Sequence, residues 1–224
     1  ERQMNIPAAR GTVIDRNGVV LVQSESVFSA LLDVREFLKK DTGARVETIE
    51  KLNAILQEDV DDPKVDNLFG NVDLEKESSV VVRVGIDAKD AAALRLLHDP
   101  AIVVRDDYRR EYPYSQIFAH VIGYTGKREQ GSLIEGKTGI EAQYDHDLRG
   151  RDGLLVAAHD AHGDVLATRV AAEAMIGATI RITLDAELQS YVYTRLEDGL
   201  KSLGRDAGVA IALKPKTGEV LALV

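Results

Sequence analysis

The sequence of 224 residues contains no cysteine, which excludes a disulfide framework and any metal site built from thiolates. It also lacks an apolar run near the roughly 20 residues that a membrane-spanning helix needs, and it shows no signal-peptide pattern at its beginning. Negative charge exceeds positive charge, with 37 Asp and Glu against 28 Lys and Arg and a net charge of −9, and no long basic run is present. A nucleic-acid partner is therefore not expected, because phosphate binding needs a clustered positive surface.

The remaining composition is that of an ordinary folded protein, with 45% hydrophobic and 29% charged residues. The length suits one large domain or two small ones. The chain begins at Glu1 rather than at methionine, and its last residues, Leu221 to Val224, lie inside an apolar run. We therefore expect a piece of a longer protein.

Three segments share one hairpin design, in which a polar turn joins two runs rich in β-branched and apolar residues. The first turn lies at residues 15–18, where Asp15 suits the first position and Gly18 the fourth. The second hairpin joins residues 154–159 to 165–170, and the third joins residues 209–213 to 220–224. Their spacing is irregular, so they do not form a sequence repeat.

Between the first two hairpins, apolar residues at helical spacing predict two helices and a strand. The first helix covers about residues 45–58, and its apolar face consists of Val46, Ile49, Leu52 and Leu56. A strand over residues 79–84 follows, and Asp87 then caps a helix with the apolar face Ala91, Leu94 and Leu97. Residues of about 34–98 are therefore expected to form an inserted α/β subdomain.

The second half of the chain predicts three more helices. One covers residues 116–122 and ends at Gly123, and a glycine-rich loop over residues 126–139 follows it. A short helix then ends at Gly150, with Ile140, Tyr144 and Leu148 on one face. After a strand at residues 179–183, Asp185 caps a longer helix, whose apolar face consists of Leu188, Val192, Leu196, Leu200 and Leu203.

Two Lys-Thr-Gly triplets, at residues 137–139 and 216–218, match one of three motifs that mark penicillin-interacting enzymes. The nucleophile motif of these enzymes, Ser-x-x-Lys, is absent, because no serine of the chain has a lysine three positions later. The first triplet lies at a glycine-rich helix entry and the second in a hairpin turn. We therefore interpret both as structural, and we expect no catalytic residue in this chain.

An alternative function is that of a stand-alone hydrolase or metal-dependent enzyme built on His159 and His162. These histidines could supply two ligands, with Asp160 or Asp164 as a third. They flank a predicted tight turn, however, where exposed polar side chains are common whatever the function. The structural interpretation is therefore favoured, and neither a metal nor another cofactor is expected.

Five segments, taken together and in this order, resemble the class B penicillin-binding proteins, especially the elongation-type branch that includes penicillin-binding protein 2. They are PAARGTVIDRNG (residues 7–18), REYPYSQIFAHVIGYTG (110–126), GKTGIEAQYDHDLRGRDG (136–153), ITLDAELQ (182–189) and VAIALKPKTGEVLALV (209–224). The last two are similar to the first helix and first β-hairpin of the transpeptidase domain in that family.

The resemblance implies an α+β fold, with an elongated pedestal of β-hairpins and short helices and an inserted α/β head. Residues 1–176 would be the non-catalytic pedestal, or dimerisation, domain, with the head at about residues 34–98. Residues 177–224 would begin a transpeptidase domain whose serine nucleophile follows Val224. The full-length protein would then be a peptidoglycan D,D-transpeptidase, although this piece of it would not be an enzyme.

In this family the pedestal holds the transpeptidase domain away from the membrane. The resemblance implies a polytopic membrane glycosyltransferase of the elongation machinery, together with other cell-wall synthesis proteins, as partners, and a homodimer is a further expectation. It also implies an extracytoplasmic location, periplasmic or on the outer face of the cell membrane, with an N-terminal membrane anchor.

The resemblance points to a set of architectural residues rather than catalytic ones. Arg10 is expected to pair with a carboxylate such as Glu141, Asp15 and Gly18 to shape a turn, and Gly139 to free the chain to enter a helix. The full set comprises Arg10, Gly11, Asp15, Arg16, Asn17, Gly18, Gly139, Glu141, Tyr144, Arg149 and Gly150.

Overall fold

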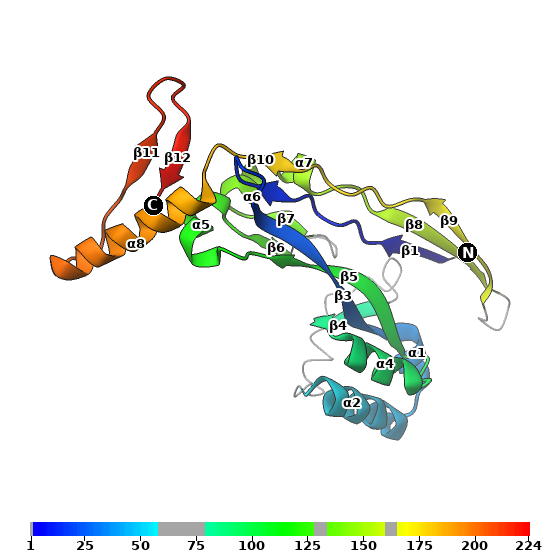
Figure 1. Cartoon of the computed structure of the whole chain (residues 1–224). Helices are drawn as coiled ribbons and strands as arrows, with labels where there is room; N and C mark the ends of the chain where they lie inside the picture. Colours follow the sequence, from blue (N-terminus) through cyan, green and yellow to red (C-terminus); the bar gives the residue numbers. More distant parts are fainter. Residues whose placement is uncertain (1, 58–78, 128–133, 160–164) are drawn as a thin grey trace. The chain divides into compact units, whose positions relative to one another are not determined.

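A computed structural model describes residues 2–57, 79–127, 134–159 and 165–224 of the chain (Figure 1). Its contacts divide the chain into two compact units. The first unit comprises Glu1–Glu25 and Arg110–Val224, and the second comprises Ser26–Arg109. Both units combine sheets and helices, which confirms the predicted α+β class. None of the helices in the described ranges is long and apolar enough to cross a membrane.

One sheet of the first unit has three antiparallel strands in the order β1-β8-β9. They are β1 (Arg2–Ile6), β8 (Gly153–His159) and β9 (Val165–Ala172). The β8–β9 pair confirms the second predicted hairpin. Its turn, at residues 160–164, lies outside the described residues.

The first predicted hairpin is formed by β2 (Val13–Ile14) and the long strand β3 (Val20–Asp33), which pair antiparallel. In the turn between them, the Gly18 N–H donates to the Asp15 carbonyl at 3.2 Å. The strand predicted at residues 179–183 is shorter than expected: β10 covers Ile180–Arg181 and pairs with β2 in parallel.

The glycine-rich segment after α5 (Ser115–Ile122) differs from the prediction of a loop. It contains a short antiparallel pair, β6 (Thr125–Lys127) and β7 (Ile134–Gly136). The helix predicted around Tyr144 is also divided, into α6 (Gly139–Gln143) and α7 (Asp145–Leu148). At the break, Tyr144 has φ −109° and ψ 24°, which interrupt the helix. Its side chain is 42% exposed, so Ile140, Tyr144 and Leu148 do not form one continuous buried face.

The last part of the first unit consists of α8 (Ala186–Ser202) and the hairpin of β11 (Ile211–Leu213) and β12 (Val220–Leu223). Both elements confirm predictions, including the cap, because the Asp185 carboxylate accepts the Leu188 N–H at 3.0 Å. The predicted apolar face of α8 is wrong at its end, since Leu203 is 74% exposed.

The core of the first unit gathers side chains from residues distant in sequence. Its buried members are Val13, Leu21, Val22, Phe118, Ile122, Leu148, Leu184 and Ala186. The N-terminal hairpin, α5, α7 and the start of α8 therefore share one apolar centre, which fixes the backbone around the site described below.

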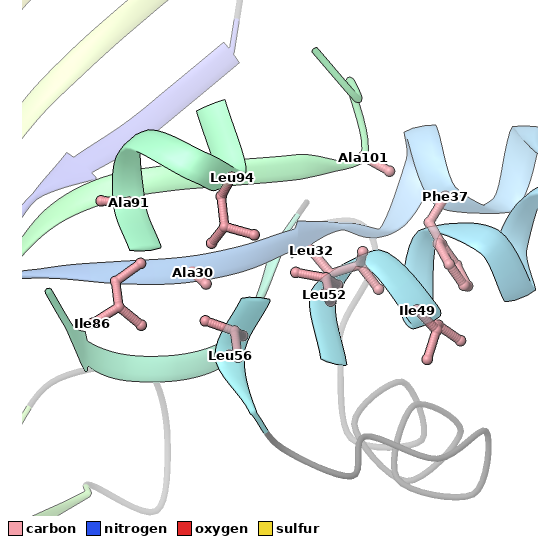
Figure 2. Packing of buried hydrophobic residues seen from close by; sticks show 10 residues of the cluster. All are labelled: Ala30, Leu32, Phe37, Ile49, Leu52, Leu56, Ile86, Ala91, Leu94 and Ala101. Atoms are coloured by element: carbon pink, nitrogen blue, oxygen red, sulfur yellow. The ribbon is translucent and has the colours of Figure 1, made fainter. Parts of the chain in front are cut away.

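The second unit has its own core between helices and the distal half of β3 (Figure 2). Its elements are α1 (Val34–Lys39), α2 (Thr42–Leu56), β4 (Ser79–Ile86), α4 (Ala88–Leu96) and β5 (Ile102–Glu111), whose last two residues belong to the first unit. The buried members are Ala30, Leu32, Phe37, Ile49, Leu52, Leu56, Ile86, Ala91, Leu94 and Ala101.

Most of the predicted helix faces in this unit are confirmed, including the Asp87 cap of α4, whose carboxylate accepts the Asp90 N–H at 2.7 Å. Val46 is the exception, since it is 41% exposed while Thr48 is buried. The Thr48 hydroxyl donates to the Ala44 carbonyl and lies 2.9 Å from an Asp99 carboxylate oxygen. A satisfied hydroxyl thus occupies the face on which the apolar pattern placed Val46.

Candidate functional site

Glu141 is the centre of a buried ion cluster in the first unit. It lies on the first turn of α6 and is 0% exposed. One carboxylate oxygen accepts a hydrogen bond from Arg10 Nε at 2.6 Å, and the other accepts one from Arg110 Nε at 2.8 Å. The expected pairing of Arg10 with Glu141 is confirmed, and Arg110 is a second partner that the sequence analysis missed. Two guanidinium groups thus compensate one buried carboxylate.

Arg10 uses the rest of its guanidinium group to hold the chain around α6. Its Nη2 donates to the Glu141 carbonyl at 2.8 Å, and its Nη1 donates to Asp145 at 2.8 Å. Asp145 also accepts the Gly136 N–H at 2.8 Å and pairs with Arg149 at 3.3 Å. Burial alone would raise the pKa of Asp145, but the Gly136 N–H and the Arg10 guanidinium bring that pKa below its ordinary value.

Arg110 connects the same carboxylate to the N-terminal segment. Its Nη1 donates to the Gly11 carbonyl at 2.6 Å and to the Arg10 carbonyl at 3.2 Å. Burial lowers the pKa of Arg110 below its ordinary value, and the Glu141 carboxylate opposes this effect. We call Arg10, Arg110, Glu141, Asp145 and Arg149 the arginine–glutamate cluster.

The Gly11 position requires glycine for a steric reason, because the backbone of residues 177–178 passes close to it. A Cβ atom there would lie 1.9 Å from the Ala178 carbonyl oxygen. The Gly11 N–H also donates to the Leu148 carbonyl at 2.7 Å. The glycine therefore lets three segments of the chain meet beside the cluster.

A second group of contacts centres on Asp15, which is 0% exposed. One of its carboxylate oxygens accepts the N–H groups of Asn17 and Val19, at 2.7 and 2.8 Å. The other accepts the N–H of Ala186, the first residue of α8, at 3.0 Å. Asp15 therefore shapes its own turn and also fastens the beginning of α8 to that turn.

The neighbours of Asp15 strengthen this connection. The Asn17 side-chain amide donates to Asp185 at 3.0 Å, and the Arg16 N–H donates to the Leu184 carbonyl at 3.0 Å. The Arg16 guanidinium lies 3.7 Å from Glu219. The hydrogen bonds from the Leu188 N–H and from Asn17 lower the pKa of Asp185 below its ordinary value. We call residues 15–18, with their contacts to residues 184–186, the Asp15 turn.

Gln189 is a structural residue that the sequence pattern did not single out. It is 0% exposed on α8. Its amide nitrogen donates to the carbonyls of Ile117 and Leu223, at 3.1 and 2.6 Å, and its amide oxygen accepts the Leu223 N–H at 2.7 Å. A polar residue among the apolar positions of a helix was the available signal, since such residues are buried only when they are satisfied.

The remaining predicted residues take part through the backbone or at the edge of the cluster. Gly18, Gly139 and Gly150 have φ angles of +90°, +60° and +70°, which favour glycine. The Tyr144 carbonyl accepts the N–H groups of Asp147 and Leu148, at 3.1 and 2.9 Å, so its backbone carries the turn into α7.

This arrangement suits mechanical support better than bond-making chemistry. Both oxygens of Glu141 are occupied by guanidinium groups, which makes the carboxylate a poor base or metal ligand. Residues 137–139 lead into α6, which begins at Gly139, and residues 216–218 lie in the turn before β12, as predicted for the two Lys-Thr-Gly triplets. Within the described ranges, no group of three potential metal ligands is present. His159 ends β8, and His162 lies outside the described residues.

Comparison with known proteins identifies a family. Residues 5–182 match the family described as the penicillin-binding protein dimerisation domain. The probable peptidoglycan D,D-transpeptidase PenA of Neisseria gonorrhoeae is 31% identical over 230 residues, which cover 99% of this chain and 36% of PenA. Peptidoglycan D,D-transpeptidase MrdA of Acinetobacter baumannii is 29% identical over 238 residues, covering 100% of this chain and 33% of MrdA.

A solved structure, that of penicillin-binding protein 2 in complex with MreC from Helicobacter pylori, has a similar fold. It gives a TM-score of 0.76 at 23% identity and covers 100% of this chain and 42% of that one. The chain spans about a third of the length of the curated relatives it matches. Since the family match extends over most of the sequence, this chain belongs to the penicillin-binding protein dimerisation domain family.

Proposed function

We propose that this chain is a non-catalytic support that positions the transpeptidase domain of a peptidoglycan-synthesising enzyme. In this proposal residues 1–176 form the pedestal, about residues 34–98 form its head, and residues 177–224 begin the transpeptidase domain. The proposed function rests on structural contacts rather than on a reactive group.

The observation that carries the proposal is the bond between Asp15 and the first turn of α8. The buried Asp15 carboxylate accepts the Ala186 N–H at 3.0 Å, across 171 positions of sequence. The arginine–glutamate cluster holds the preceding residues, Arg10 and Gly11, against α6 and α7. A rigid path of hydrogen bonds therefore leads from the N-terminal segment to the proposed start of the transpeptidase domain.

We further propose that the full-length protein is a D,D-transpeptidase whose nucleophilic serine lies beyond Val224. The absence of Ser-x-x-Lys from this sequence and the greater length of the curated relatives support this proposal. Labelled penicillin tests it directly. The full-length protein should become labelled and the 224-residue chain should not. Stable labelling of the 224-residue chain would contradict the proposal.

As partners we propose a polytopic membrane glycosyltransferase and other proteins of the elongation machinery, on the extracytoplasmic side of an anchoring membrane. The fold shared with a penicillin-binding protein 2 that was solved with MreC supports a role in assembly. Deleting residues 34–98 from the full-length protein and measuring polymerase activity in a reconstituted pair tests the head. Activation should fall while penicillin labelling persists, and unchanged activation would exclude a head-dependent mechanism.

A further inference from the structure

The Gln189 side chain takes the place that a neighbouring strand would have beside the end of β12. At the base of the β11–β12 hairpin, Ala210 and Val224 exchange two hydrogen bonds of 2.9 Å. The next pair, Ile211 and Leu223, therefore does not bond within the hairpin, and the N–H and C=O of Leu223 point away from β11. The Leu223 N–H donates to Gln189 Oε1 at 2.7 Å, and Gln189 Nε2 donates to the Leu223 carbonyl at 2.6 Å. An antiparallel strand would supply the same two bonds.

The same amide also binds α5. An amide nitrogen carries two hydrogens, and Nε2 of Gln189 donates the second one to the Ile117 carbonyl at 3.1 Å. Ile117 lies on α5, within the residues 5–182 that match the dimerisation domain, whereas Gln189 and Leu223 follow that match. One side chain, which is 0% exposed, thus joins the matched domain to β12.

Other contacts hold the beginning of β12 but not its end. The Thr183 hydroxyl donates to the Val220 carbonyl at 2.8 Å. The Asp185 N–H donates to the Leu221 carbonyl at 2.9 Å. Without the Gln189 amide, the end of β12 would keep its hairpin partner β11 but would lose its hydrogen bonds to α8.

We propose that Gln189 is a positioning residue for transpeptidation in the full-length protein. The inference rests on the proposed function, in which residues 177–224 begin the transpeptidase domain and the nucleophilic serine follows Val224. Leu223, the residue that Gln189 holds, is the last residue of β12 and immediately precedes Val224. The amide therefore fixes where the catalytic part begins relative to α5. Because small displacements of reacting groups strongly lower a rate, its loss should slow the reaction even where the protein stays folded.

Glutamine is the side chain that satisfies all three contacts. Its amide supplies one acceptor and two donors, and all three are used. Methionine has a similar length but lacks these groups, so Gln189→Met would leave three backbone groups without their partner. Glutamate keeps the acceptor and loses both donors, so Gln189→Glu would place a carboxylate against two carbonyl oxygens. Protonation of that carboxylate would return one donor.

The rate at which labelled penicillin acylates the full-length protein tests the proposal. Gln189→Met should lower this rate about 5- to 150-fold, the usual range of coupling between two sites. Leu52→Ala is the matched control, because it opens a cavity in the separate core of the second unit and should leave the rate within about 2-fold of the parent. Rates are compared at a temperature at which circular dichroism shows every variant to be folded.

Gln189→Glu provides a second readout, its pH profile, which a purely structural role would not change. Burial favours the protonated form of a carboxyl group, and that form regains a donor for one of the two carbonyls. The ratio of the Gln189→Glu rate to the parent rate should therefore rise as the pH is lowered from about 8 to about 5.

Three results would overturn the proposal: a parent-like rate for Gln189→Met, an equal loss of rate in Leu52→Ala, or a ratio for Gln189→Glu that does not depend on pH. Failure of both Gln189 variants to fold would assign the residue to folding alone and would overturn the proposal as well. The proposed function fails separately, if the parent full-length protein is not acylated at all.

Discussion

At the scale of single residues, the arginine–glutamate cluster makes stability depend on charge compensation. Glu141 is 0% exposed, and Arg10 and Arg110 are 7% and 4% exposed. Removing one partner of a buried ion pair leaves an uncompensated charge in a medium of low polarity. The main effect of the cluster on stability is therefore that any single substitution leaves a buried charge without compensation.

We expect Glu141→Gln to lower the free energy of unfolding by about 3–5 kcal/mol, because the buried Arg110 loses the carboxylate that it pairs with and Arg10 keeps only Asp145. Glu197→Gln is a matched control on the surface of α8, where the pair with Lys201 is exposed to solvent, so we expect little change in stability. Urea denaturation measures both. Equal melting temperatures for the parent, Arg10→Ala and Glu141→Ala proteins would contradict the structural importance of the cluster.

Two glycine substitutions should change stability in opposite directions. Gly11→Ala places a Cβ atom 1.9 Å from the Ala178 carbonyl, so the backbone must move and we expect a loss above about 2 kcal/mol. Gly199 lies in α8, and a Cβ atom there meets nothing within 4 Å. Gly199→Ala should stabilise the protein by up to about 1 kcal/mol, through helix propensity. Thermal unfolding that moves in the same direction for both would refute this explanation.

Asp145 gives the cluster a pH dependence with a definite sign. Its folded-state pKa lies below the ordinary value of about 3.9, so its contribution is complete above that value and is lost as pH falls through the folded pKa. The stability difference between the parent and Asp145→Asn should therefore shrink on acidification below about pH 4. A difference that stays constant from pH 7 to pH 3 would show that the ionised carboxylate contributes nothing.

At the scale of secondary-structure elements, the Asp15 turn acts as an external cap for α8. The helix has its own cap, Asp185, whose carboxylate accepts the Leu188 N–H. Asp15 satisfies the N–H of Ala186, one of the donors that a helix leaves unpaired at its N-terminus. The helix start is thus held both by its own sequence and by a distant hairpin.

Replacing Asp15 by asparagine tests this element directly. The amide can keep one acceptor oxygen for the turn, but its NH₂ group then faces the Ala186 N–H, and we expect a loss of about 1–3 kcal/mol. Hydrogen exchange should accelerate in the first turn of α8. Asn17→Ala, which removes only an exposed contact, is the milder control. Equal exchange in the parent and in Asp15→Asn would mean that the cap has no mechanical role.

Contacts between residues close in sequence could be predicted, and most contacts between distant residues could not. The three hairpins and the caps at Asp87 and Asp185 follow from local chemistry, because turn and cap residues act on neighbours within four positions. The burial of Thr48 and Gln189 was missed because their partners, Asp99 and Leu223, are distant in sequence. The pairing of Arg10 with Glu141 was reached only through the family resemblance, and Arg110 completes it from 100 positions away.

At the scale of the whole molecule, the two compact units have separate apolar cores. The first core contains Phe118, Ile122 and Leu148, and the second contains Leu52, Leu56 and Leu94. Strands β3 and β5 belong to both units by sequence, since the boundaries fall at residues 25–26 and 109–110. If the two cores unfold independently, the second unit could move or bind a partner without destabilising the first unit.

Leu52→Ala measures this independence, because Leu52 is 1% exposed in the core of the second unit (Figure 2). We expect the cavity to cost about 2–5 kcal/mol. If the cores unfold separately, hydrogen exchange should accelerate in α2 and α4 while amides of α5 and α8 keep their protection. Phe118→Ala is the matched cavity in the first unit and should give the reverse pattern. Loss of protection in all four helices from either substitution would mean one cooperative unit, and the proposed head could then not act as a module distinct from its pedestal.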